Sequence, residues 1–216
     1  GDEIILNLTA RDAFGNRVDK RCNFSMRLLR QGGHEVLGFV EKLPSSKSNG
    51  DSDAPTHRCR ATLYESALYD LRVTEGFDFL PSMPTAVLVE PQRPHPLSCV
   101  ITSNVDNITE VRRHLTVGDI AELFLIAKDK YGNVCDLTID DISARIVWPH
   151  ESVNSKMLSD GKDKCEIQPL GDGTYKCQYG STRAGKFALN LLHEGKHVFG
   201  SPLYVNVEAG GSDIES

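Results

Sequence analysis

The sequence lacks the features of a membrane-spanning or nucleic-acid-binding protein. Its longest apolar runs are a handful of residues, whereas a transmembrane helix needs about 18 or more. The formal net charge is −6, which argues against nucleic acid and anionic membranes as main partners. No stretch longer than a few residues holds a 3.6-residue apolar period, so long amphipathic helices are not expected.

Motifs for catalysis and metal binding are also missing. No Cys-x-x-Cys pair occurs, and no serine lies in a Gly-x-Ser-x-Gly context. The seven histidines are scattered without catalytic spacing, so we expect exposed or rim positions for His34, His57, His95, His114, His150, His193 and His197. We therefore expect no enzyme activity, no metal, no cofactor and no small-molecule substrate.

Calcium between domains is a weaker alternative. It would draw on Asp12, Asp129, Asp136, Asp140 and Asp141. No Asp-x-Asp-x-Asp-Gly loop is present. Aspartates in the pattern Ala-x-Asp-x-x-Gly-Asn more often cap the backbone of their own turn, and we favour that interpretation.

What the chain does contain is an internal repeat. Residues 1–19 read GDEIILNLTARDAFGNRVD and residues 118–136 read GDIAELFLIAKDKYGNVCD, identical at nine of nineteen positions without a gap. A period near 117 residues is too long for a solenoid unit and suits one small domain. The chain is therefore predicted to hold two copies of one module.

Both copies show the period-two alternation of β-strands. In the second copy, predicted strand faces are formed by Leu123, Leu125 and Ala127; Ala144, Ile146 and Trp148; Tyr175, Cys177 and Tyr179; Phe187, Leu189 and Leu191; and Leu203, Val205 and Val207. In the first copy the predicted strands are 4–12, 23–30, 34–43, 57–65, 67–74 and 84–90. About seven short strands in the second copy indicate an antiparallel β-sandwich, and the first copy follows the same order.

The predicted domains are residues 1–92 and 93–208, with a flexible tail at 209–216. Pro91, Pro94 and Pro96 mark the junction. The second copy has a leading strand at 98–104 with no counterpart before Gly1, so we expect the chain to be a fragment whose first domain lacks its first strand. The polar segment 44–56 is predicted to be an insertion loop.

Cysteines and glycosylation sequons favour an oxidising, extracellular setting. The six cysteines fall two in the first copy and four in the second. Sequons at Asn7, Asn23 and Asn107 are predicted to carry N-glycans in a secretory host. The alternative is a cytosolic protein whose thiols are buried as small apolar groups.

The second copy resembles the filamin repeat family. LGDGTYKCQY at 170–179 is similar to its DGTY-x-V-x-Y, and EGKHVFGSPL at 194–203 is similar to its G-x-H-I-x-G-S-P-F. AKDKYGN at 127–133 matches A-x-D-x-x-G-N. In the first copy DGTY becomes APTH at 54–57 and GSPF becomes SMPT at 82–85, whereas A-x-D-x-x-G-N is kept at 10–16.

The resemblance implies an all-β chain of two tandem immunoglobulin-like (filamin-type) antiparallel β-sandwich domains. Most such repeats belong to cytosolic actin cross-linkers. A smaller group lies on cell surfaces, including gamete-surface adhesion proteins of flowering plants, and the cysteines and sequons here fit that group. In a filamin-type sandwich we expect a disulfide Cys22–Cys59. Among three possible connectivities in the second copy, Cys99–Cys135 and Cys165–Cys177 are favoured.

Three functions remain open. The favoured one is an extracellular adhesion module, plausibly for gamete attachment, that binds a protein on an apposed cell surface or another copy of itself. The others are an intracellular scaffold that adds a peptide strand at the C–D edge and an accessory domain of a secreted enzyme. The parent protein is expected to be membrane-anchored outside this segment. Candidate partner-binding residues are Ser45, Asp51, Asp53, Ile146, Trp148, Cys165 and Ile167.

Overall fold

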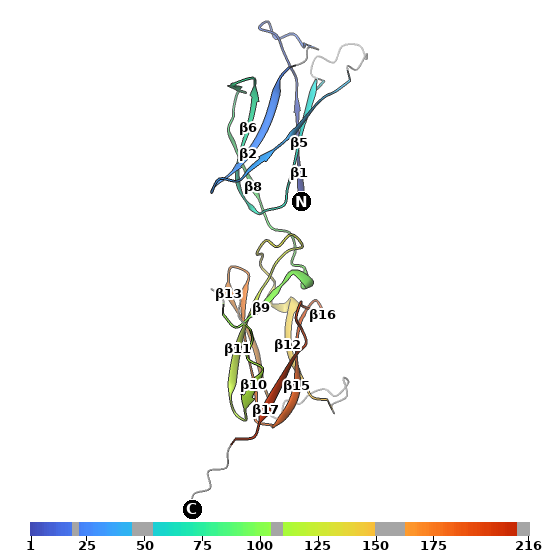
Figure 1. Cartoon of the computed structure of the whole chain (residues 1–216). Coiled ribbons are helices and arrows are strands. Elements are labelled where there is room, and N and C mark those ends of the chain that lie inside the picture. The colour runs from blue at the N-terminus through green and yellow to red at the C-terminus, as the bar shows by residue number, and fades with distance from the viewer. Residues whose placement is uncertain (19–21, 45–53, 105–109, 150–162, 211–216) are drawn as a thin grey trace, which may run out of the picture. The chain divides into compact units, whose positions relative to one another are not determined.

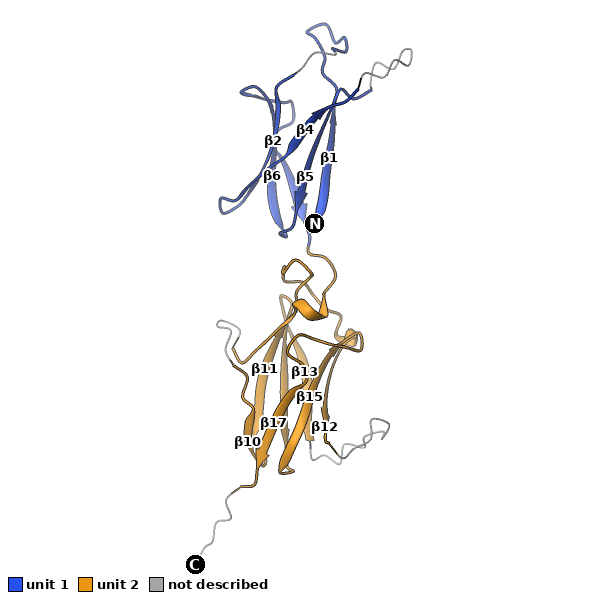
Figure 2. Cartoon of the chain, turned by 45° about the vertical axis from the view of Figure 1, so that its right-hand side comes forward, with its two compact units in different colours: residues 1–90 blue, residues 91–216 orange. Residues whose placement is uncertain are grey.

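The chain is nearly all β (Figure 1). The computed structural model describes residues 1–18, 22–44, 54–104, 110–149 and 163–210. It has two compact units, Gly1–Glu90 and Pro91–Ser216 (Figure 2). Their boundary lies two residues before the division that the sequence suggested. No helix among the described residues has the length and apolar character needed to cross a membrane.

Unit 2 (Pro91–Ser216) is a sandwich of two sheets. One has the strand order β13-β14-β11-β9, and the other has the order β10-β17-β15-β12 with β16 beside β15. All described pairings are antiparallel except β10 with β17. The strands are β9 (Val100–Thr102), β10 (His114–Thr116), β11 (Ile120–Ile126), β12 (Ile142–Val147), β13 (Asp163–Gly171), β14 (Thr174–Ser181), β15 (Gly185–His193), β16 (Lys196–His197) and β17 (Leu203–Glu208). Two 3-10 turns, η1 (Pro96–Ser98) and η2 (Ile139–Asp141), lie between strands.

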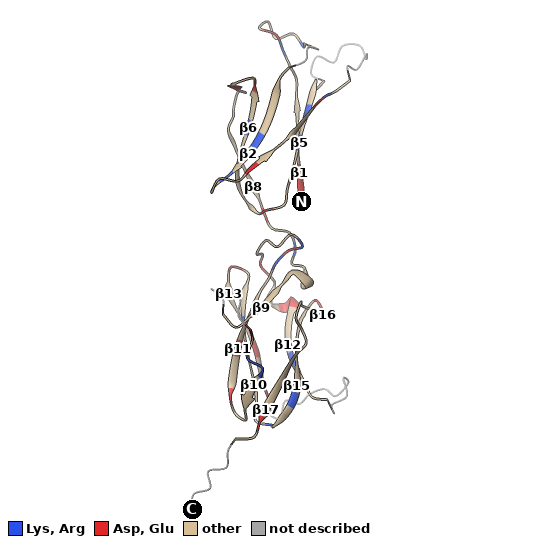
Figure 3. Cartoon of the chain, viewed as in Figure 1, with Lys and Arg blue, Asp and Glu red and all other residues tan. Residues whose placement is uncertain are grey.

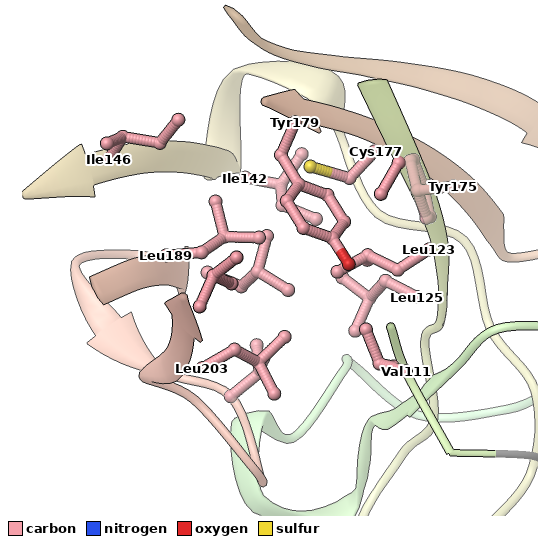
Figure 4. Close-up of a cluster of buried hydrophobic side chains, with 14 of the residues drawn as sticks. Val111, Leu123, Leu125, Ile142, Ile146, Tyr175, Cys177, Tyr179, Leu189 and Leu203 are labelled. Carbon is pink, nitrogen blue, oxygen red and sulfur yellow. The ribbon is translucent and has the colours of Figure 1, made fainter. Parts of the chain in front are cut away.

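The core of unit 2 confirms the predicted alternation. The inward residues of β11, β14, β15 and β17 are buried, and several, including Leu123, Tyr179 and Leu189, are fully enclosed (Figure 4). Ala144 and Trp148 pack partly buried against the same cluster. Burial of each large apolar side chain stabilises the fold by roughly 1.5–3 kcal/mol. The period-two pattern therefore predicted which face of each strand meets the opposite sheet.

Unit 1 (Gly1–Glu90) repeats this design. Its sheets have the orders β1-β5-β4 and β3-β2-β6-β7, with β8 also paired to β6. Its core includes Met26, Leu28, Cys59, Leu71 and Val73. The strands are β1 (Asp2–Leu8), β2 (Phe24–Arg30), β3 (Glu35–Leu37), β4 (Phe39–Lys42), β5 (His57–Leu63), β6 (Ala67–Glu75), β7 (Asp78–Phe79) and β8 (Thr85–Val89).

One predicted strand of unit 1 is divided in two. Residues 34–43 read as a single strand in the sequence, but β3 pairs with β2 in one sheet and β4 pairs with β5 in the other. The chain changes sheets at Gly38, whose backbone N–H donates to the Met26 carbonyl at 2.8 Å. A Cβ at Gly38 would lie 2.7 Å from the Met26 sulfur. Only glycine permits this close approach of backbone to side chain.

The repeat is visible in the hydrogen bonds of the two units. Asp12 N–H donates to the Asn16 carbonyl, and Asp129 N–H donates to the Asn133 carbonyl, both at 2.9 Å. Gly15 and Gly132, with φ of 84° and 89°, close the two turns. Both units also hold one cis X-Pro bond before the last strand, at Met83-Pro84 and Ser201-Pro202. The Asp12 turn and the Met83-Pro84 bond of unit 1 thus correspond to the Asp129 turn and the Ser201-Pro202 bond of unit 2.

Candidate functional site

The predicted C–D edge of unit 2 consists of β12 and β13. Among the described residues, β12 pairs only with β15 and β13 pairs only with β14. Each strand therefore lies at the outer edge of its sheet, and the two are adjacent across the sandwich. The side of each strand without a neighbour presents backbone N–H and C=O groups to a partner.

The structure places the predicted contact residues of this edge at different depths. Ile146 is only 3% exposed and belongs to the core (Figure 4), so its prediction as a partner contact was wrong. Its side chain faces the opposite sheet because the β12 alternation points it inward. Cys165 and Ile167 are partly buried and pack against the same core. Of these three residues, only the last two retain surface that a partner could reach.

Trp148 follows the last residue of β12 and is held by three neighbours. Its indole Nε1–H donates to the Asp163 carboxylate at 2.9 Å. The Arg183 guanidinium lies over the ring, 4.5 Å from the centroid, and Phe187 packs against it at 5.5 Å between ring centroids. A Cβ at Gly185 would lie 3.2 Å from the ring. The indole is thus fixed beside the edge. It is half-buried, because part of it packs against the core and the rest is exposed.

Asp163 is the polar centre of this cluster. It also accepts a hydrogen bond from the Ser181 hydroxyl at 2.6 Å and forms an ion pair with Arg183. Burial by itself would raise the pKa of the Asp163 carboxyl, but the hydrogen bonds from Ser181, Arg183 and Trp148 outweigh it and lower that pKa. The carboxylate therefore stays charged and ties the start of β13 to the end of β12.

The other candidate surface, the insertion after β4, lies for the most part outside the described residues. Ser45, Asp51 and Asp53 lie outside the described residues.

Asn107, one of the three predicted glycosylation sites, also lies outside the described residues. The remaining two are described: Asn7 on β1 and Asn23 before β2 both have exposed side chains. Leu6 and Leu8 pack against the core, which turns Asn7 outward as the alternation predicted.

All six cysteines are thiols in the structure. Cys165 forms a side-chain hydrogen bond with Cys177, and this bond together with burial raises the pKa of the Cys177 thiol. Cys165 lies opposite Tyr179 and Cys177 opposite Ile167, so the two cysteines are diagonal neighbours. Diagonal Cα atoms are about 7–8 Å apart, whereas a disulfide spans more than about 7 Å only if the backbone moves. The pairing stays a prediction.

The second predicted pair of unit 2 is also brought together. Cys99 precedes β9, and Cys135 N–H donates to the Ala127 carbonyl just past β11. Burial, together with the neighbouring Asp129, Cys99 and Asp136, raises the pKa of the Cys135 thiol to about 11. Both thiols are buried. This pairing also stays a prediction.

The predicted pair of unit 1 joins a residue before β2 to a residue of β5. Cys59 lies inside the sandwich, opposite Leu6, whereas Cys22 precedes β2 and contacts Glu75. The rings of Phe24 and His57 meet at 4.9 Å. Cys22 is two residues before Phe24 and Cys59 two residues after His57. The strands next to them, β2 and β5, belong to different sheets of unit 1, and the Cys22–Cys59 pairing stays a prediction.

Two of the aspartates considered for calcium, Asp12 and Asp129, act mainly within their own turns. Asp129 Oδ1 accepts the N–H groups of Tyr131 and Asn133 at 2.8 and 3.0 Å. Its Oδ2 accepts Gln92 N–H at 3.0 Å and the Asn133 amide at 2.9 Å. Asp12 caps its own turn in the same way. The carboxylate oxygens are therefore used by backbone donors, as the sequence pattern indicated.

Two histidines are buried, which the sequence analysis did not expect. His57 is 2% exposed and His193 is 4% exposed. His193 continues the inward series Phe187, Leu189, Leu191 of β15, so the same period-two rule that found the core could have placed it. One ring nitrogen of His193 also lies near the carboxylates of Asp141 and Glu194, and no sequence motif joins these residues.

Comparisons with known proteins agree with this geometry. The sequence model described as the Filamin/ABP280 repeat matches residues 89–204, more than half of the chain. The chain is 26% identical over 201 residues to tripartite motif-containing protein 2 of Homo sapiens and of Mus musculus, covering 89% of this chain. It spans 24% of the length of those relatives. The solved structure of Yersinia pseudotuberculosis InvD has a TM-score of 0.50 at 16% identity, covering 99% of this chain and 54% of that one.

Proposed function

This chain belongs to the Filamin/ABP280 repeat family, and from that premise we propose that it is a non-catalytic adhesion module that recognises a protein partner. The observation that carries the proposal is the open edge of β12 and β13 in unit 2. A partner segment in extended conformation would pair with the backbone of this edge. The fixed indole of Trp148 and the partly exposed Cys165 and Ile167 would supply side-chain contacts for selectivity.

The extracellular side of a plasma membrane is the proposed setting. Asn7 and Asn23 are exposed and accessible to a glycosyltransferase, and two cysteine pairs of unit 2 are neighbours. Both features suit an oxidising compartment. Within that setting, attachment between gametes is the specific role that the sequence resemblance suggests. The partner would lie on an apposed cell or be a second copy of this protein.

A second candidate is an intracellular scaffold that uses the same edge for peptide strands. It is favoured by the free thiols of Cys22 and Cys59, the only two cysteines of unit 1. The two settings are separated by expressing the chain in a secretory host. A mass shift on glycosidase treatment that is lost in Asn7→Gln with Asn23→Gln supports the extracellular setting, and an unglycosylated, fully reduced product supports the scaffold.

The binding surface is tested by charge reversal at the edge. Arg145 is exposed on β12, and Lys186 is exposed on β15 of the same sheet, which has neighbours on both sides. Cells that display the chain with Arg145→Glu should attach to their partner cells less than wild type, while Lys186→Glu should attach normally. A third variant without residues 45–53 tests the insertion. Normal attachment by the Arg145→Glu variant, with loss in the deletion variant, would move the site to the insertion.

A further inference from the structure

Three metal-ligating side chains converge at one end of unit 2. Asp141 is the last residue of η2, His193 is the last residue of β15, and Glu194 follows it in the turn to β16. One carboxylate oxygen of each acid and one ring nitrogen of the histidine all lie within 4.8 Å of one another. Figure 3 shows acidic positions at this end of the unit, where β12 begins beside β16.

The backbone fixes the three residues relative to one another. His193 is the partner of Ile142 in the antiparallel pairing of β12 and β15. Glu194 N–H donates to the Asp141 carbonyl at 2.8 Å, and Glu194 adopts a positive φ of 49°. The turn therefore holds both carboxylates next to the imidazole before any ligand arrives, which reduces the conformational entropy that a ligand must overcome.

His193 supplies an independent indication of a ligand. It is 96% buried, since only 4% of its surface is exposed, and its Nδ1 has no hydrogen-bond partner among the described residues. An unpaired buried polar atom is unfavourable, because it has lost its hydrogen bonds to water without gaining another partner. A neutral imidazole offers one nitrogen lone pair, which is the usual ligand that histidine gives to a metal ion.

The other copy of the repeat has the same backbone without these ligands. In unit 1, Gly76 N–H donates to the Asn23 carbonyl at 2.9 Å, the counterpart of the bond from Glu194 to Asp141. Asn23, Glu75 and Gly76 thus occupy the positions of Asp141, His193 and Glu194. The fold requires the backbone bond in both units but not the donor set, so the three ligands need another explanation.

We propose that Asp141, His193 and Glu194 bind one divalent transition-metal ion, with Zn²⁺ as the first candidate. One imidazole and two carboxylates are a ligand set that zinc accepts, with water completing a tetrahedral shell. Zinc bonds of about 2.0–2.1 Å require closer ligand atoms than 4.8 Å, and the two exposed carboxylates can rotate inward. Calcium prefers six to eight oxygen ligands and is disfavoured by the imidazole.

The expected effect of the ion is to tie the η2 turn to the turn between β15 and β16. A ligand that binds only the folded chain raises the midpoint of unfolding in proportion to the logarithm of its concentration over Kd. Zn²⁺ should therefore raise the unfolding temperature of unit 2, and a chelator should reverse the rise. Ca²⁺ at the same concentration should leave it unchanged.

Isothermal titration of the purified, reduced chain with ZnCl₂ tests the proposal. Saturable binding of one equivalent is expected, weakened at least tenfold by Asp141→Asn and by Glu194→Gln. Asp140→Asn is the matched control, because it removes the same charge from the neighbouring exposed residue that is not part of the group. Both acids are exposed, so these variants should keep the fold.

Two further readouts separate this site from the cysteines. Co²⁺ bound at the proposed site should lack the charge-transfer absorption of thiolate ligands, and Zn²⁺ should shift the imidazole NMR signals of His193. Absence of saturable Zn²⁺ binding, unchanged affinity in both the Asp141→Asn and Glu194→Gln variants, or a thiolate band with Co²⁺ would each overturn the proposal.

Discussion

The hydroxyl of Tyr175 forms two hydrogen bonds with the backbone of Leu137. It donates to the Leu137 carbonyl at 2.7 Å and accepts the Leu137 N–H at 2.8 Å. The phenol is 3% exposed. Burial raises the pKa of Tyr175, so the group is neutral and keeps its proton for the carbonyl. Through this pair β14 anchors the segment that leads from β11 to β12.

Tyr175→Phe should therefore destabilise unit 2 by about 1–2 kcal/mol, because it leaves the backbone N–H and C=O of Leu137 without this partner. Urea unfolding followed by the fluorescence of Trp148, the only tryptophan, measures the change within unit 2. Tyr204→Phe is the control, since Tyr204 is 69% exposed and should change little. Equal midpoints for the two variants would contradict the structural role of the hydroxyl.

Asp129→Ala should cost more stability than Asp12→Ala, although the two residues are repeat equivalents. Asp129 is fully buried and accepts four hydrogen bonds, whereas Asp12 is exposed. We expect a loss of about 2–3 kcal/mol for the buried carboxylate and below about 1 kcal/mol for the exposed one. Scanning calorimetry resolves this as a larger fall in unfolding temperature for Asp129→Ala. The reverse order would contradict the assignment.

Stability should fall at acid pH through Asp129 and Asp163. Burial would raise the pKa of each carboxyl, but their hydrogen bonds outweigh it and lower both pKa values. A carboxyl with a lowered pKa in the folded state stabilises fully above its unfolded pKa of about 3.9, and this contribution is lost as pH falls through the folded value. The urea midpoint should be steady from pH 7 to 5 and drop below about pH 4.

Asp163→Asn should make that acid-induced drop shallower, because one of the two responsible carboxyls is gone. Asp140→Asn, at an exposed position, provides the control and should keep the drop of the wild type. A midpoint that rises between pH 5 and pH 3 in the wild type would show that other groups dominate.

Oxidation should join the cysteines of unit 2 before those of unit 1. Cys165 and Cys177 already share a hydrogen bond, and Cys99 contributes to raising the pKa of the Cys135 thiol, whereas burial is the cause that raises the pKa of Cys59 in unit 1. After mild oxidation of the folded chain, non-reducing peptide mapping should find Cys165–Cys177 and Cys99–Cys135. Prior formation of Cys22–Cys59 would contradict this order.

Much of the fold follows from local sequence patterns. Alternation places Leu123 and Leu125 in the core, because successive side chains of a strand point to opposite faces. The Asp129 turn is equally local, since its carboxylate reaches N–H groups only two and four residues ahead. The first copy keeps the turn motif at Asp12, and the structure gives it the same hydrogen bonds.

Local sequence patterns did not predict how deeply each side chain is buried or which distant residues it contacts. Ile146 lies on the strand face that the alternation predicted. This face meets the opposite sheet, so the side chain is buried and cannot contact a partner. The break at Gly38 depends on the position of Met26 in another strand. The placement of β2 and β5 in different sheets depends on pairings between strands that are distant in the chain.

The sequence by itself therefore determined the repeat, the strands, their inward faces and the capped turns, because each depends on residues a few positions apart. Only the tertiary structure decided which edge strands lack a neighbour, how Trp148, Asp163 and Arg183 form one cluster, and that Asp141 meets His193 and Glu194. These relationships arise when strands distant in the chain are paired and packed. No short-range pattern in the sequence encodes the distances that result.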